Sequence, residues 1–251
     1  MLWDSVSADA TRESEPSSVV GRLAALLVSL SAERPRVVSI EGPDAAGKTT
    51  LADALAVAIE TTKSRHALRV QADHFLHSRR IRYQRGMASP AGYVEDSYDH
   101  DALQALVLRP LRDGDRWIER QIFDRASDAP ICESKEHVPP DAIVIVDGAF
   151  LLSRQLRPYW TLSIVLKVQE EEILRRAQER DVGRLDGASG VIERYRSRYL
   201  PGYTLYTERE DPERHTDVLI DNTELLSPTV LRWPPSTYTG HHARASRRDS
   251  A

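Results

Sequence analysis

The chain contains 251 residues with a formal net charge of −4, and 41% of its residues are hydrophobic while 29% are charged. These values are typical of a soluble globular protein, and they give no general reason to expect a nucleic acid or an anionic membrane as partner. The single cysteine, Cys132, excludes an internal disulfide and is interpreted as a small hydrophobe. The sequence contains no run of 18 apolar residues, which a membrane span would need, and residues 1–18 do not resemble a secretory signal. We therefore expect a cytoplasmic protein.

The first third of the chain predicts two helices and two strands after a disordered start at residues 1–16. A serine cap followed by regularly spaced leucines predicts a helix that ends near Pro35. The β-branched run at 37–40 is typical of a buried strand, and the apolar residues of 51–59 recur at helical spacing. Residues 68–72 then predict a second strand.

The middle of the chain has weaker patterns. Residues 74–98 show no clean period and predict a long irregular segment, which in compact domains is often functional. A helix is expected at 101–108, before a proline. The alternation at 116–123 predicts an edge strand, paired with residues 131–132 in a small flap.

The last part of the chain continues the alternation of strands and helices. Strands are expected at 142–146, 162–168 and 216–220, and helices from residue 170 and up to Pro201. Such alternation implies a parallel sheet covered on both faces, in a three-layer α/β domain. We assign residues 17–226 to this domain and expect residues 227–251 to be loop-like or disordered.

A phosphate-binding pattern, G-x-x-x-x-G-K-[ST], lies between the first strand and its helix. Its glycines let backbone N–H groups turn toward phosphates, the lysine supplies positive charge, and the first threonine offers a hydroxyl to Mg²⁺. The helix N-terminus adds its positive dipole end. The residues expected to bind a nucleoside triphosphate are Gly42, Asp44, Ala45, Ala46, Gly47, Lys48, Thr49 and Thr50.

Further motifs follow the loop in a fixed order. They are Asp73-His74-Phe75, Asp96-Ser97-Tyr98-Asp99, Val146-Asp147-Gly148, Arg175-Arg176 with Arg180-Asp181, and Asp217-Val218-Leu219-Ile220. With them the chain resembles the uridine kinase and phosphoribulokinase family of P-loop kinases from about residue 36 to 222. The resemblance implies a five-stranded parallel sheet, an arginine-rich lid, and ATP with Mg²⁺ as phosphoryl donor.

The resemblance is incomplete at the substrate side. Leu76 stands where uridine kinases usually have tyrosine, and Phe123-Asp124-Arg125 replaces a Tyr-Asp-Phe that is followed by histidine and contacts the pyrimidine in those enzymes. Gly42-Pro43-Asp44 and Asp124-Arg125 are similar to thymidylate kinases, but only there. These departures concern the acceptor and leave the phosphoryl-transfer residues intact.

Phosphoryl transfer needs cations near the phosphates and one acid near the acceptor. Asp73, at the end of a strand, is the expected general base, and Asp147 would join Thr49 in holding Mg²⁺. Lys48, Arg176 and Arg180 are the expected catalytic cations, with Arg184 on the same stripe if the helix continues. The less favoured alternatives are that each acid caps a turn or helix and that the arginines form a solvated face.

A polar and aromatic cluster near Asp73 is the expected contact surface for the acceptor. Its members are His74, His77, Arg80, Arg82, Tyr83, Tyr93 and Asp96. The later tyrosines, at helical spacing, are interpreted as packing residues.

The sequence therefore predicts an ATP- and Mg²⁺-dependent small-molecule kinase, acting on a hydroxyl and favouring a nucleoside as acceptor. A nucleotide kinase, a kinase of another sugar alcohol, and a nucleotide-binding module without catalysis stay open. A GTPase is disfavoured because no Asn-Lys-x-Asp element occurs, and an ABC-type ATPase because no Leu-Ser-Gly-Gly-Gln element occurs. Neither nucleic acid nor membrane is expected as a partner, and a homo-oligomer is compatible with the sequence.

Overall fold

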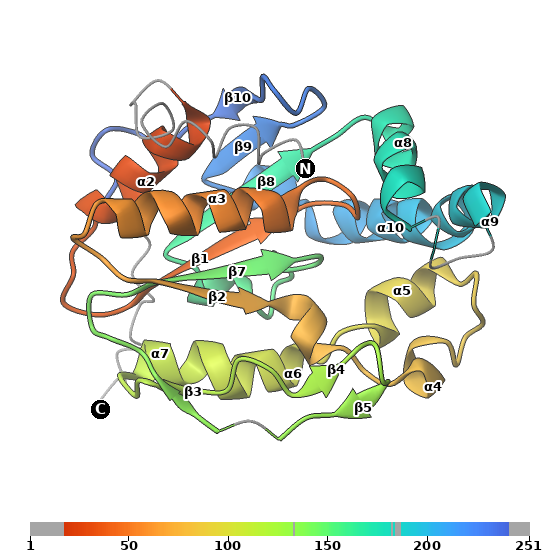
Figure 1. Ribbon diagram of the computed structural model, residues 1–251, viewed down its shortest axis with the longest axis horizontal. Coiled ribbons are helices and arrows are strands. Elements are labelled where there is room, and N and C mark those ends of the chain that lie inside the picture. The colour runs from red at the N-terminus through yellow and green to blue at the C-terminus, as the bar shows by residue number, and fades with distance from the viewer. Residues whose placement is uncertain (1–17, 133, 182, 184–186, 241–251) are drawn as a thin grey trace, which may run out of the picture.

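The computed structural model describes residues 18–132, 134–181, 183 and 187–240. A six-stranded sheet in the order β10-β9-β8-β1-β7-β2 lies at its centre (Figure 1). The strands are β2 (Ala67–Gln71), β7 (Ile143–Gly148), β1 (Arg36–Glu41), β8 (Leu162–Lys167), β9 (Val218–Asp221) and β10 (Thr229–Arg232). The first five of these are parallel to their neighbours, as expected from the sequence.

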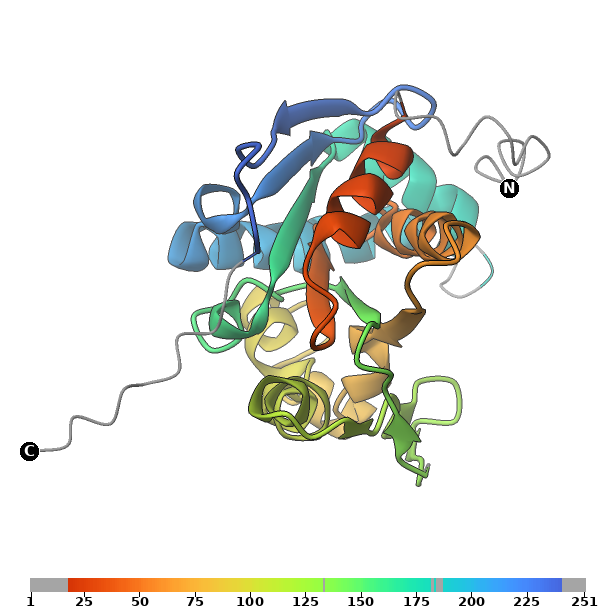
Figure 2. The ribbon, with the colours of Figure 1, turned by 90° about the vertical axis from the view of Figure 1, so that its left-hand side faces the viewer.

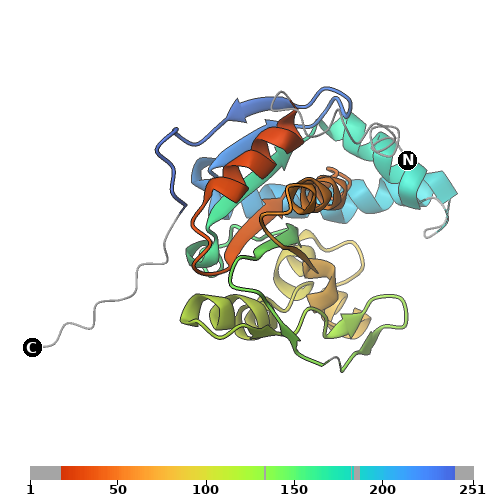
Figure 3. The same ribbon diagram turned by 60° about the vertical axis from the view of Figure 1, so that its left-hand side comes forward.

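The sixth strand corrects the expectation of a sheet with only five strands. β10 pairs antiparallel with β9 at one edge, as Figure 3 shows, and it comes from the tail that was expected to be loop-like. Only one of its four residues, Val230, is half-buried and three are exposed. A strand with so little apolar burial leaves almost no hydrophobic signal in the sequence, and its pairing depends on the free edge of β9.

Helices cover both faces of the sheet and make three layers (Figure 2). The α-helices are α2 (Val19–Ser29), α3 (Lys48–Thr61), α4 (Arg79–Arg82), α5 (Pro90–Asp96), α6 (His100–Leu103), α7 (Arg109–Asp113), α8 (Glu170–Asp181), α9 (Gly187–Arg194), α10 (Leu200–Glu210) and α11 (Pro212–His215). Short 3-10 turns, η1 (Ala72–Phe75) and η3 (Arg157–Tyr159), and π-helical turns, η2 (Gln104–Leu108) and η4 (Tyr195–Tyr199), join them. No helix in the described residues is long and apolar enough to cross a membrane.

Alternate residues of the strands fill two separate cores. In β1, Val38 packs in the core beneath α2 and α3, while Val37 packs in the core on the opposite face, against α6 and α7. β7 divides its side chains in the same way, with Ile145 on one face and Val146 on the other. A strand buried on both faces reads as a continuous apolar run, which is why these strands were recognisable.

Two helices are longer than the sequence predicted, and each contains a proline. The helix expected at 101–108 continues through η2 and α7 to Asp113, past Pro110. Pro110 has no N–H to offer to the carbonyl of Leu106, and that carbonyl accepts instead from the N–H of Glu119 over 3.2 Å. Likewise the helix expected to end at Pro201 runs on through α10 to Glu210, because the π-helical turn η4 puts Pro201 in the first turn of α10.

The segment from 74 to 98 is only partly irregular. It contains α4 and α5 as well as the end of η1, so the expectation of an irregular segment holds only for the residues between these elements. In place of the expected single strand at 116–123 paired with residues 131–132, the flap consists of two short antiparallel ribbons, β3 (Trp117–Ile118) with β6 (Glu136–His137) and β4 (Phe123–Asp124) with β5 (Ala129–Pro130). The second ribbon carries Arg125 at its turn.

Candidate active site

The phosphate loop connects β1 to α3 with the conformation its glycines predict. Gly47 has a φ of 89°, and a Cβ there would lie 2.9 Å from Nδ2 of Asn222. At Gly42 a Cβ would lie 2.7 Å from the carbonyl oxygen of Leu166. Asn222 also donates to the carbonyl of Ala46 over 2.8 Å. The neighbouring strand ends therefore enclose this loop so closely that only glycine fits at both positions.

Lys48 begins α3 with its ammonium group inside the loop. Nζ donates to the carbonyl of Pro43 over 2.7 Å and pairs with no carboxylate among the described residues. Burial lowers the pKa of Lys48, the carboxylates of Asp44, Asp73 and Asp147 act in the opposite direction, and Arg180 adds to the lowering. A half-buried cation whose one close partner among the described residues is a neutral carbonyl suits an anionic ligand.

Asp147 ends β7 at the same rim as the loop. In the sheet it pairs in register with Ile40 of β1 and with Gln71 of β2. Its Oδ2 accepts from the hydroxyl of Thr49 over 2.6 Å, so the structure brings together the two residues expected to hold Mg²⁺. A hydroxyl and a carboxylate are Mg²⁺ ligands. The described residues contain no group of three or more His, Cys, Asp or Glu side chains that could hold a metal ion.

Arg69 donates a hydrogen bond to the other carboxylate oxygen of Asp147, a contact that the sequence did not predict. Its Nη2 donates to Oδ1 over 2.6 Å, and its Nη1 pairs with the exposed Asp53 on α3. Asp147 is buried, so an unpaired charge there would be costly. Arg69 therefore neutralises the carboxylate that is the candidate metal ligand.

Asp73 lies in η1, directly after β2, at the rim that carries the loop. The end of β2 approaches β7 so closely that a Cβ at Gly148 would lie 2.3 Å from the Cβ of Ala72. Oδ1 of Asp73 accepts from the hydroxyl of Tyr98 over 3.1 Å, and Oδ2 accepts from Nη1 of Arg125 over 2.9 Å. The expected base is thus on the correct side of the sheet, held by two donors that the sequence analysis did not assign to it.

The arginines of α8 separate into two kinds. Arg176 is buried; it donates to Glu172 and to the backbone carbonyls of Asn222 and Thr223. These contacts attach α8 to the segment that holds the phosphate loop, whereas the buried Nη1 has no hydrogen-bond partner among the described residues. The contacts favour a structural role for Arg176, and its expected role as a catalytic cation stays a prediction.

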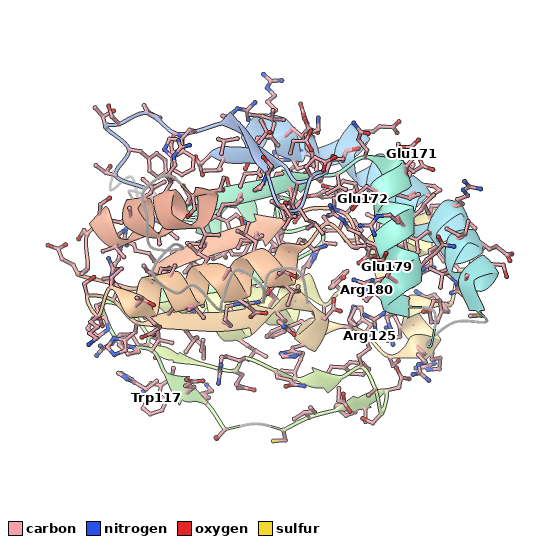
Figure 4. All side chains as sticks on the ribbon, turned by 45° about the horizontal axis from the view of Figure 1, so that its top comes forward. Trp117, Arg125, Glu171, Glu172, Glu179 and Arg180 are labelled. Atoms are coloured by element: carbon pink, nitrogen blue, oxygen red, sulfur yellow. The ribbon has the colours of Figure 1, made fainter. Side chains whose placement is uncertain are left out.

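Arg180 extends from the last turn of α8 toward the same region as Arg125, as Figure 4 shows. Its guanidinium donates to Asp181 and to the hydroxyl of Tyr195, and half of its surface is exposed. Its charge acts on Lys48 and is itself influenced by Asp44. Arg180 remains the candidate for contact with the transferring phosphate, whereas Arg184 lies outside the described residues.

The predicted acceptor residues do not form one continuous surface. Tyr93 contributes most directly, because its buried hydroxyl donates to Asp44 of the loop over 2.6 Å and its ring packs on Phe150 and Tyr199. Tyr83 lies on the same side, with the guanidinium of Arg198 4.8 Å from its ring centre.

The other residues that were predicted to contact the acceptor lie in different environments. Arg82 and Asp96 are buried in ion pairs with Asp128 and Arg85, which makes them structural. Nδ1 of His77 lies 4.0 Å from Oδ2 of Asp99. Arg80 is exposed on α4, and His74 is half-buried beside Asp73.

The functional residues that the sequence missed are Arg125, Tyr98 and Arg69. The first two lay inside motifs that had been noticed, Phe123-Asp124-Arg125 and Asp96-Ser97-Tyr98-Asp99, but nothing in either motif indicates a contact with Asp73. Tyr199 was expected to be a packing residue, and its ring does pack on that of Tyr93. The charges of Asp44 and Arg125 also influence the pKa of its hydroxyl. Such contacts need the tertiary structure.

The fold and the loop together define a three-layer α/β protein with a P-loop. No protein-family model matches the sequence, and no curated protein matches it either. A possible uridine kinase from Bacillus stearothermophilus is similar in structure, with a TM-score of 0.64 and 18% identity over 80% of this chain and 96% of that one.

Two further solved structures are also similar to this chain. A protein assigned as a fructose transport system kinase from Silicibacter sp. TM1040 has a TM-score of 0.62 and 24% identity, over 76% of this chain and 95% of that one. D-glycerate 3-kinase from Cryptococcus neoformans has a TM-score of 0.53 and 13% identity, over 85% and 99%. This chain therefore shares the fold of these three solved structures.

Proposed function

We propose that this chain is an ATP- and Mg²⁺-dependent kinase that transfers the γ-phosphoryl group to a hydroxyl of a small molecule. The observation that carries the proposal is the convergence of Lys48, Asp73 and Asp147 at one rim of the sheet, around a loop that only glycines can form. The similar structures support it, because a possible uridine kinase and D-glycerate 3-kinase are kinases named for acceptors that carry hydroxyl groups.

In the proposed reaction the acceptor oxygen forms a bond to the γ-phosphorus, the bond between that phosphorus and the β–γ bridging oxygen breaks, and ADP leaves. Asp73 takes the proton of the acceptor hydroxyl. Lys48 and Arg180 would stabilise negative charge on the phosphoryl oxygens. Thr49 and Asp147 would hold Mg²⁺, which supplies further charge neutralisation when bound.

The acceptor stays the open part of the proposal. A nucleoside is favoured by the sequence, with a nucleoside monophosphate or another sugar alcohol as alternatives, and a module that binds ATP without turnover is the non-enzymatic alternative. We propose the cytoplasm as the site of action, and a small molecule, with no nucleic acid or membrane, as the partner.

Acceptor-dependent release of ADP from ATP and Mg²⁺ tests the function across nucleosides, nucleotides and sugar alcohols. Lys48→Ala should lower kcat by about 10²–10³-fold or more, because charge at the phosphates is lost. The matched control is Lys167→Ala, whose ammonium group is half-exposed and pairs with Glu213, and it should retain activity. Binding of ATP without formation of product from any acceptor would favour the non-catalytic module. A wild-type rate for Lys48→Ala would show that the active site is not at this loop.

A further inference from the structure

Phe150 lies at the rim that carries both halves of the candidate site, because of the strand that precedes it. In the sheet β7 lies between β1, which leads into the phosphate loop, and β2, which leads to Asp73. The chain leaves β7 at Gly148, and Phe150 follows shortly afterwards with only 1% of its surface exposed. The strand order therefore brings one buried aromatic ring to the loop and to the candidate base.

Two tyrosines pack edge-on against this ring, and each donates to a different carboxylate of the site. The ring centres of Phe150 and Tyr93 are 4.9 Å apart, and the hydroxyl of Tyr93 donates to Asp44 of the loop over 2.6 Å. The ring centre of Tyr98 lies 5.8 Å from that of Phe150, and its hydroxyl donates to Asp73 over 3.1 Å. One ring thus supports the side chains that hold both carboxylates.

A third tyrosine packs on the ring from α10. The ring centres of Tyr206 and Phe150 are 4.9 Å apart, and the Tyr206 hydroxyl donates over 2.7 Å to Glu41, which directly precedes the loop. The same oxygen of Glu41 accepts from the N–H of Leu152 over 2.5 Å. The start of the loop is therefore attached to the same aromatic cluster.

The backbone of Phe150 has a conformation that a bulky residue rarely adopts. Its φ is 65°, in the left-handed region. Contacts of the next two residues hold the turn: the carbonyl of Leu151 accepts from Nε1 of Trp160 over 2.8 Å, and the N–H of Leu152 donates to Glu41. Such residues persist where their surroundings determine the conformation, and they gather at functional sites.

We propose that Phe150 is a positioning residue that fixes the phosphate loop and the candidate base relative to each other through Tyr93 and Tyr98. Its ring has no polar atom, so it can act on Asp44 and Asp73 only through the tyrosines that hold them. The inference rests on the proposed kinase function, because in-line transfer needs the phosphoryl group and the acceptor oxygen at the correct spacing. A misplacement of about 1 Å can cost about 10²-fold in rate.

Replacement of Phe150 by leucine keeps an apolar side chain in the cluster and removes the ring. kcat should fall by about 10- to 100-fold, while the Kd for a non-hydrolysable ATP analogue changes by less than about threefold, because Lys48 and the loop N–H groups remain. Leu27→Ala, in the core beneath α2 and α3, is the control for lost stability and should keep the wild-type kcat. A kcat for Phe150→Leu equal to that of wild type, or an equal loss in Leu27→Ala, would overturn the inference.

Removal of single hydroxyl groups tests the two connections while the rings keep their packing. Tyr93→Phe and Tyr98→Phe should each lower kcat by about tenfold. Tyr203→Phe is the matched control, since its ring packs on that of Tyr206 and its hydroxyl donates to no carboxylate among the described residues. If Phe150→Leu does not fold, a wild-type kcat in either of the first two variants decides against the inference.

Double variants show whether the ring acts through the tyrosines. In a chain that carries Phe150→Leu, the further change Tyr98→Phe should have a much smaller effect than in the wild type, because residues that act through one another are not additive. The same is expected for Tyr93→Phe. Effects that simply multiply would show that Phe150 does not act through these tyrosines.

The exchange of hydroxyl protons gives a test that needs no turnover. In protein with labelled tyrosine side chains, NMR should show the hydroxyl protons of Tyr93 and Tyr98 exchanging with water about tenfold faster in Phe150→Leu, since their hydrogen bonds open more often. The hydroxyl of Tyr238, which donates to the carbonyl of Thr161 before β8, is the control and should not change. Faster exchange in a chain that phosphorylates no acceptor would remove the kinase proposal and leave the two carboxylates positioned by Phe150. Unchanged exchange would overturn the inference whatever the turnover.

Discussion

Arg125 donates a hydrogen bond to Asp73 over 2.9 Å, although 52 residues of chain separate them. The contact joins the turn of the flap to the residues that follow β2. The candidate base therefore has a charged partner before any substrate is present. A substitution at Asp73 that keeps this hydrogen bond can therefore test its role as a base without disturbing the fold.

Replacing Asp73 by asparagine should leave ATP binding intact and lower kcat by about 10²–10⁴-fold, since the amide cannot take the proton. The amide oxygen can still accept from Tyr98 or Arg125, so the flap should stay in place. Steady-state rates and titration with a fluorescent ATP analogue measure the two effects. Asp113→Asn, at an exposed site on α7, is the control. A variant with undiminished kcat would show that the base is elsewhere.

Arg176 and Arg180 should respond differently to the same change. Arg176→Ala removes a buried guanidinium that holds α8 to the carbonyls of Asn222 and Thr223, so it should lower the free energy of unfolding by about 1–3 kcal/mol. Arg180→Ala should leave the melting temperature nearly unchanged and lower kcat by about tenfold or more. Thermal unfolding and kinetics of both variants decide the assignment. The reverse pattern would restore Arg176 as the catalytic cation.

Arg69→Gln should destabilise the protein in the absence of metal by about 2 kcal/mol, because Asp147 is left buried and without its charged partner. Mg²⁺ should then raise the melting temperature of the variant more than that of the wild type, since the metal no longer competes with the arginine. Thermal unfolding with and without Mg²⁺ measures both effects.

Asp53→Asn provides the control for Arg69, because it removes the exposed partner and keeps the contact with Asp147. It should change stability by less than about 1 kcal/mol. If Arg69→Gln unfolds at the wild-type temperature without Mg²⁺, the arginine does not neutralise Asp147 in the way the geometry indicates.

Glu41, directly before the phosphate loop, should make stability depend on pH. Burial raises the pKa of Glu41 to about 7, against hydrogen bonds from Tyr206 and the N–H of Leu152 that act in the opposite direction. The folded protein thus holds a proton on Glu41 at pH values where the unfolded chain, with the ordinary pKa of 4.5, has lost it. The contribution of this group to stability is complete below pH 4.5 and is lost as pH rises to about 7.

His100 titrates in an overlapping range with the opposite sign, because burial lowers its pKa to about 4 and its contribution is lost as pH falls. The wild-type profile alone would therefore hide both groups. The difference in unfolding free energy between wild type and Glu41→Gln isolates Glu41: it should shift by about 3 kcal/mol in favour of the wild type as pH falls from 7 to 4.5. Urea unfolding at several pH values measures it, and a constant difference would contradict the raised pKa.

The local patterns that were readable in the sequence are those that short-range physics dictates. The phosphate loop needs glycine at two positions and a lysine at the helix start, so residues 42–50 identify it without any knowledge of the fold. The parallel strands were recognisable because both of their faces are buried. The ends of these strands then placed Asp73 and Asp147 at the rim of the loop.

Long-range contacts decided the rest, because a pattern along the chain does not contain them. The pairing of Arg125 with Asp73, of Arg69 with Asp147 and of β10 with β9 each joins segments whose proximity exists only after the sheet has formed. The same holds for Arg176 and Arg180, four residues apart on one helix: Arg176 is buried and donates to the carbonyl of Asn222, whereas the side chain of Arg180 is half exposed. Sequence spacing places both arginines on one stripe of the helix, but the burial of each depends on what packs against that stripe.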